Sequence, residues 1–118
     1  MALKSIGVVS TRPGAGVAPG TGTAASAVLL SGHNGVRLTG KYTAGTGKIF
    51  LLRWEPDLPG GGEWRPWRSA QAVTIDGTEL DKYFDAIFAQ EKGGRNYFLV
   101  FAAAALSGVT AHVEEGNY

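Results

Sequence analysis

The chain has 118 residues, a length typical of one domain that can bury a hydrophobic core without covalent staples. Its 11 basic and 10 acidic side chains give a net charge of +1, which argues against a phosphate backbone or an anionic membrane as the main partner. The sequence contains no cysteine, so disulfide bonds and thiolate metal sites are excluded.

Residues 1–26 differ in composition from the rest of the chain. They are rich in Gly, Ala, Thr, Ser and Pro and contain two Pro-Gly turn signals. Such a segment cannot by itself bury enough apolar surface to offset the entropy lost on ordering. We therefore predict an extended N-terminal arm over residues 1–26, lying on a neighbouring subunit, and a folded domain over residues 27–118. The alternative is that the arm packs back on its own domain.

No membrane-spanning or secretory segment is predicted. The longest apolar run, residues 97–106, is half as long as a membrane-spanning helix. The short apolar patch at residues 6–9 is followed by Arg12 and Pro13, which interrupt it before it reaches the length of a signal-peptide core. These features predict a protein that is cytoplasmic or part of something assembled in the cytoplasm.

From residue 27 onward, short apolar runs alternate with glycine-rich turns. Strands are predicted over residues 27–31, 36–43, 48–55, 71–75, 83–90, 97–106 and 109–114, with 63–68 as an eighth. Asn34-Gly35 and Gly93-Gly94 are typical hairpin turns. Seven or eight short strands at this spacing indicate an all-β fold, and we predict an antiparallel, jelly-roll-like β-sandwich.

Residues 48–55 are apolar on both sides of the predicted strand. Ile49 and Leu51 alternate with Phe50 and Leu52, so neither face is polar. This pattern implies burial on both faces, or a subunit contact on one of them.

Residues 78–92 fit two patterns. A helix would begin with Thr78 and Asp81 as a capping box and would place Leu80, Phe84 and Phe88 at helical spacing. We favour a strand over residues 83–90, preceded by a turn or a single helical turn at residues 78–82.

The sequence Trp64-Arg65-Pro66-Trp67-Arg68 combines the residue types that are enriched at the centres of protein interfaces. Pro66 lowers the entropy cost of ordering this loop on binding. The alternative is that one Trp closes the end of the core while the Arg side chains pair with nearby acids. A third interpretation is a saccharide platform, in which exposed Trp rings stack on sugars.

Three other patterns lack parts that a catalytic or metal site requires. Residues 43–48 resemble a phosphate-binding loop but lack its first glycine and its Ser or Thr, and they fit a hairpin turn. His33 and His112 have no second ligand at metal-binding spacing. The acidic residues do not follow a calcium-loop pattern: Asp76, Glu79, Asp81 and Asp85. We predict no catalytic residue, no metal site and no cofactor.

A series of segments carries a family resemblance. They are Val36-Arg37-Leu38-Thr39-Gly40, the apolar strand ending at Trp54, Gly60-Gly61-Gly62-Glu63-Trp64, Val73-Thr74, the Tyr-led strand at 83–89, Tyr97-Phe98-Leu99-Val100, and residues 106–111. Together they resemble the small β-sandwich structural proteins of tailed-phage virions, over about two thirds of the chain. The loop at residues 64–68 departs from that pattern by its richness in Trp and Arg.

The resemblance implies a non-enzymatic virion protein, such as a capsid decoration (cement) protein that stabilises the major capsid lattice. Its partners would be the major capsid protein or other virion subunits and further copies of itself, as a dimer or trimer, with no membrane and no direct nucleic acid contact. The expected interface residues lie in the arm and the Trp loop: Ile6, Val8, Val9, Arg12, Trp64, Arg65, Trp67 and Arg68. The alternative function is a glycan-binding module of a tail or receptor-binding structure.

Overall fold

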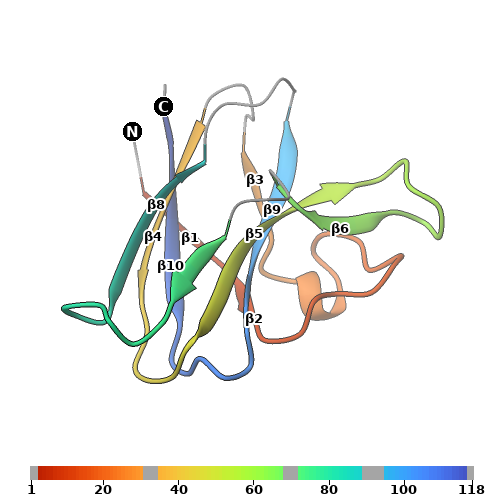
Figure 1. Ribbon diagram of the computed structural model, residues 1–118. Helices are drawn as coiled ribbons and strands as arrows, with labels where there is room; N and C mark the ends of the chain where they lie inside the picture. Colours follow the sequence, from red (N-terminus) through yellow and green to blue (C-terminus); the bar gives the residue numbers. More distant parts are fainter. Residues whose placement is uncertain (1–2, 31–34, 68–71, 89–94, 117–118) are drawn as a thin grey trace.

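The computed structural model describes residues 3–30, 35–67, 72–88 and 95–116, which form two β-sheets packed on one another (Figure 1). Sheet A is antiparallel, in the order β1 (Lys4–Ile6), β10 (Thr110–Gly116), β4 (Gly35–Lys41), β8 (Tyr83–Phe88). Sheet B has β9 (Asn96–Ala102) and β5 (Gly47–Glu55) at its centre. Beside β9 lie β2 (Val8–Val9) and β3 (Val28–Leu30), and beside β5 lie β6 (Glu63–Pro66) and β7 (Val73–Ile75).

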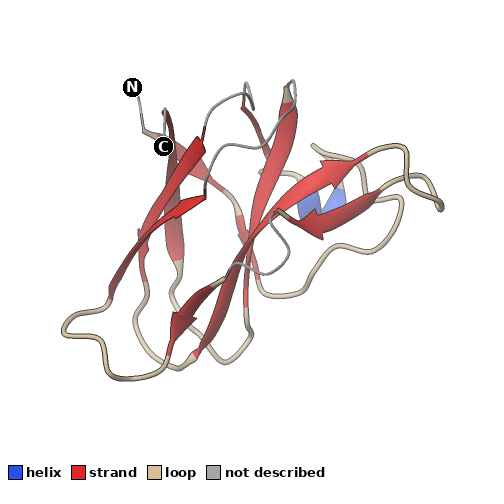
Figure 2. Ribbon diagram, turned by 45° about the horizontal axis from the view of Figure 1, so that its top comes forward, coloured by secondary structure: helices blue, strands red, loops and turns tan. Residues whose placement is uncertain are grey.

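Helical structure is slight in the part of the chain described here. It consists of η1 (Gly22–Ala24), a short 3-10 turn that Figure 2 shows beside sheet B. Among the described residues, no helix is long and apolar enough to cross a membrane. The predicted all-β class with two packed sheets is therefore confirmed.

The strand count and the pairing differ from the sequence prediction at the N-terminus. The described residues form ten strands rather than seven or eight, because the chain already enters the sheets at residues 4–9. Sheet B is mixed rather than antiparallel, since β2 runs parallel to β9, with Val8 opposite Val100. The chain leaves sheet A after Ile6 and joins sheet B at Val8, so Gly7 alone makes the crossing.

The main hydrophobic core lies between the two sheets. It follows from the alternation of side chains along each strand, which sends every second residue inward. On β4 the inward residues are Val36 and Leu38, and on β5 they are Ile49 and Leu51, all of them buried. Val113 of β10 is also fully buried.

A second, smaller apolar cluster lies on the opposite face of sheet B. It contains Leu52, Trp64, Leu99 and Ala24, with Phe50 and other half-buried side chains packed around them. Strand β5 is therefore covered on both faces within one chain, which confirms the first of the two possibilities raised by its apolar pattern.

Most turns carry the chain between the sheets and do not form hairpins. Residues 42–46 connect β4 in sheet A to β5 in sheet B, so the phosphate-loop-like segment is a crossing turn and not the hairpin turn that its sequence suggested. The two predicted hairpins at residues 34–35 and 93–94 fall at least partly outside the described residues. The flanking strands lie in different sheets in both cases: β3 in sheet B and β4 in sheet A for the first, and β8 in sheet A and β9 in sheet B for the second. Neither strand pair therefore forms a hairpin. The β5–β6 connection is a true hairpin.

The ambiguous stretch at residues 78–92 contains a strand. Strand β8 pairs along its whole length with β4, which confirms the favoured interpretation for residues 83–88, whereas residues 89–94 lie outside the described part. The preceding segment forms a turn and no capping box: Asp76 Oδ1 accepts the backbone N–H and the hydroxyl of Thr78.

We expect Gly7→Ala to lower the free energy of unfolding by about 2 kcal/mol, because an added methyl overpacks the crossing point. A Cβ at residue 7 would lie 1.8 Å from Ser26 Oγ and 2.5 Å from Ser26 Cβ. Urea denaturation measures the effect. Gly14→Ala is the matched control, since nothing lies within 4 Å of its Cβ. An equal loss in both variants would contradict the steric argument.

Candidate interaction surfaces

The N-terminal segment covers the outer face of sheet B. After β2 the chain runs past β6, forms η1 and returns to sheet B as β3 (Figures 1 and 2). Ala24 of η1 is fully buried against Leu52, Trp64 and Leu99, and Val17 packs at the margin of this cluster. The structure therefore shows the arrangement in which residues 3–26 pack back on their own domain.

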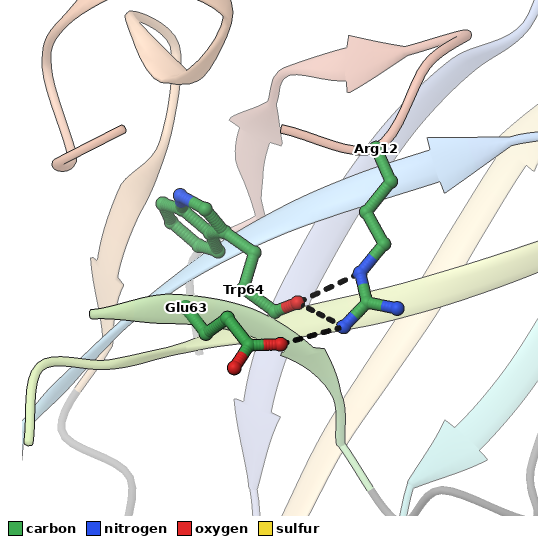
Figure 3. Close-up of polar contacts among 3 residues, drawn as sticks. All are labelled: Arg12, Glu63 and Trp64. Carbon is green, nitrogen blue, oxygen red and sulfur yellow. Dashed lines mark hydrogen bonds and ion pairs between the residues drawn. The ribbon is translucent and has the colours of Figure 1, made fainter. Parts of the chain in front are cut away.

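Arg12 attaches this segment to β6 (Figure 3). Its Nε donates a 2.8 Å hydrogen bond to the backbone carbonyl of Trp64, and its Nη2 donates a second bond to the same oxygen. Glu63 Oε1 lies 4.0 Å from Nη2, and both side chains are more than a third exposed, so this ion pair adds little. The two partly buried hydrogen bonds from the charged guanidinium to the Trp64 carbonyl contribute more to holding the segment than this ion pair does.

Two further hydrogen bonds fix the segment beyond Arg12. The indole Nε1–H of Trp64 donates to the carbonyl of Val17 at 2.8 Å, and the N–H of Gly16 donates to the carbonyl of Gly62 at 2.9 Å. Trp64 thus takes part through its side chain and its backbone, and the segment is held at three points along the β5–β6 hairpin.

The two tryptophans of the predicted contact loop are both buried in the chain's own domain. Trp64 is 0% exposed in the outer cluster, and Trp67 is 2% exposed in the core between the sheets, where its ring lies 4.9 Å from that of Phe98. Side chains three residues apart on an extended chain point to opposite faces of the sheet, so Trp64 points outward and Trp67 points into the core between the sheets. The structure shows the core-filling alternative for both, and it offers no exposed Trp platform for a saccharide.

The other predicted interface residues divide between core, margin and surface. Ile6 is buried in the main core, and Val8 and Val9 are half-buried in β2. Arg65 is exposed on β6, and Arg68 lies outside the described residues. The eight predicted residues therefore do not form one exposed surface.

The turn before β8 uses its acidic groups internally. Glu79 accepts the N–H of Asp76 and of Gly77 and also the hydroxyl of Tyr42. The hydrogen bonds from Thr78 lower the pKa of Asp76, and burial together with Glu79 raises the pKa of Tyr42. No group of His, Asp and Glu among the described residues is arranged to hold a metal ion. His112 is exposed on β10, and His33 lies outside the described part.

The outer face of β8 is the surface that the sequence interpretation did not single out. Large apolar side chains with high exposure gather on this strand and the turn before it: Leu80 at 107%, Tyr83 at 45% and Ile87 at 54%. The alternation of Tyr83, Asp85 and Ile87 was visible in the sequence, but it did not show that the face stays uncovered.

Asp85 lies between Tyr83 and Ile87 on β8, and its carboxylate forms an ion pair with Arg37 of β4. Arg37 Nε donates to Asp85 Oδ1 at 3.0 Å and Nη2 donates to Oδ2, which forms a two-pronged ion pair on the neighbouring strand. The hydrogen bonds from Arg37 lower the pKa of Asp85, which favours the ionised form of the carboxyl group. The outward side chains of Tyr83, Asp85, Ile87 and Arg37, together with Leu80 in the preceding turn, are called the β8 face below.

Comparisons of the chain with protein-family models, with curated proteins and with solved structures find no match.

We expect Arg12→Ala to lower the free energy of unfolding by about 1 kcal/mol, because the Trp64 carbonyl loses a charged donor. Limited proteolysis should then cut residues 10–27 faster than in the unaltered protein. Glu63→Gln is the control: it removes only the 4.0 Å ion pair and keeps both bonds to the carbonyl. Cleavage of Arg12→Ala at the unaltered rate would show that Arg12 does not hold the segment.

Proposed function

We propose that the protein is a non-enzymatic structural protein of a tailed-phage virion, a capsid decoration (cement) protein that binds the major capsid protein or another virion subunit. The observation that carries the proposal is the β8 face, where three of the five large, exposed apolar side chains among the described residues lie on one strand and its preceding turn. Scattered exposed apolar residues are ordinary, but a group of them marks a contact surface.

The two outer faces of the sandwich differ in a way that supports this role. The outer face of sheet B is covered by the chain's own N-terminal segment, which occupies the apolar cluster around Trp64. On sheet A, most outward side chains of β8 and β4 stay accessible, whereas Thr39 between them is buried. The accessible ones are Tyr83, Asp85, Ile87, Arg37 and Lys41. A mixture of Tyr, Arg and aliphatic side chains is typical of the centres of protein interfaces.

The contact surface in this proposal is the sandwich, and the N-terminal segment has a supporting role. Removal of residues 1–26 would delete β1 and β2, take Ile6 out of the core and uncover Trp64. Binding through the β8 face is modest in area, so strong attachment would come from many copies repeated over a lattice.

Quantitative mass spectrometry of purified native particles tests the proposal. We expect the chain to be present at a ratio near one, or a simple fraction of one, relative to the most abundant structural protein. A few copies per particle would instead indicate a tail or portal location and contradict the lattice role. Absence of the chain from the particles would contradict a virion role altogether.

A variant pair connects the particle to the β8 face. We expect particles assembled with Leu80→Ser to retain fewer copies of the chain after a salt wash, since the most exposed apolar side chain of the face is lost. Leu3→Ser is the matched control, because Leu3 is 60% exposed and directly precedes β1, the strand at the opposite edge of sheet A from β8. Equal retention of the two variants would contradict binding through the β8 face.

A further inference from the structure

Strand β8 forms an open edge of sheet A. It pairs with β4 on one side, and no described strand pairs with it on the other. Its six residues contain neither proline nor glycine, and its register with β4 runs without a bulge from Tyr83 opposite Lys41 to Phe88 opposite Val36. Proline, bulges and charged side chains are the usual means by which proteins protect an edge from further pairing. Strand β8 carries only one charged side chain, Asp85, which is paired with Arg37 of its own sheet.

The free backbone groups of this edge can be assigned to particular residues. The N–H of Tyr42 donates to the carbonyl of Lys82, so this opposed pair is a hydrogen-bonded pair of the β4–β8 ladder. In an antiparallel ladder such pairs alternate with pairs whose backbone groups point away. The N–H and C=O groups of Tyr83, Asp85 and Ile87 are therefore directed to the open edge.

An antiparallel edge of this kind is complementary to itself. When a second copy is related by a two-fold axis through Asp85, each outward residue meets one whose N–H and C=O groups are also free. Tyr83 then faces Ile87 of the second copy, and Ile87 faces its Tyr83. Aromatic and β-branched side chains in such opposed positions stabilise antiparallel sheets.

The charge at the axis is also compatible with this pairing. Two carboxylates directly opposite one another would repel, and like charges in that position destabilise a sheet. Each Asp85 is already bound by Arg37 of its own chain through two hydrogen bonds, so each carboxylate at the axis has a cationic partner that reduces this repulsion.

We propose that β8 pairs with β8 of a second copy of this chain, so that the two A sheets form one continuous sheet across a two-fold axis at Asp85. The axis is perpendicular to the sheet, so the two β8 faces lie side by side on the same surface. This proposal rests on the edge geometry and does not require a virion role, although such a dimer would double the contact surface proposed above.

Sedimentation velocity of the purified full chain over a wide concentration range tests the pairing. We expect a monomer–dimer equilibrium, which Ile87→Pro weakens more than about tenfold because one outward N–H is lost at each end of the shared ladder. Pro at this position leaves the β4–β8 hydrogen bonds unchanged, since the N–H of residue 87 points away from β4. The matched control is Tyr97→Ser, which removes an exposed aromatic side chain from β9, a central strand paired on both sides.

Cysteine cross-linking tests the register, because the natural chain has no cysteine to interfere. We expect Asp85→Cys to form a covalent dimer under mild oxidation, since opposed residues at the axis have Cα atoms within disulfide range. His112→Cys, at a position that is also exposed but lies on the central strand β10, should stay monomeric. A chain that is monomeric at every concentration, or a dimer that is insensitive to Ile87→Pro and is not cross-linked at residue 85, would overturn the proposal.

Discussion

The fold depends on covering both faces of strand β5. Ile49 and Leu51 face the other sheet, whereas Phe50, Leu52 and Trp54 face outward, so a bare two-sheet sandwich would leave one of these sets in water. Full burial of each large apolar side chain contributes roughly 1.5–3 kcal/mol. The N-terminal segment supplies the missing cover, and that requirement explains why a glycine-rich stretch with little core-forming capacity of its own is held in place.

The cover is attached by polar groups at the margin of the apolar cluster. Trp64 fills the centre of the cluster, its indole N–H meets the carbonyl of Val17, and its own carbonyl receives Arg12. Each of these groups would otherwise be a partly buried donor or acceptor without a partner, which is more costly than the bond itself is stabilising. The same residue therefore organises the hydrophobic and the polar contacts of the segment.

Because the N-terminal segment covers the outer face of sheet B, the outer face of sheet A is the accessible surface on which both proposals rest. The outward side chains of β8 and β4 combine apolar groups with the Arg37–Asp85 ion pair, and the backbone edge of β8 lies beside them. Binding to a partner would use the side chains of β8, whereas pairing between copies would use the backbone groups at its open edge. The two contacts can therefore share one strand without competing for the same atoms. The decoration role and the two-fold pairing are compatible for this reason.

Local patterns in the sequence determined much of this protein: the all-β class, the positions of β3 to β10 within a few residues, and the two-faced burial of β5. These properties follow from side-chain alternation and turn chemistry, which act over a few neighbouring residues. The tertiary structure alone decided which sheet each strand joins and that the chain crosses from sheet A to sheet B at Gly7. It also decided that Trp64 and Trp67 are buried on opposite faces of sheet B and that β8 is an edge strand. Each of these properties depends on contacts between residues that are distant in the chain. A turn pattern in the sequence predicts only that the chain changes direction, and it does not indicate which strand the next strand pairs with.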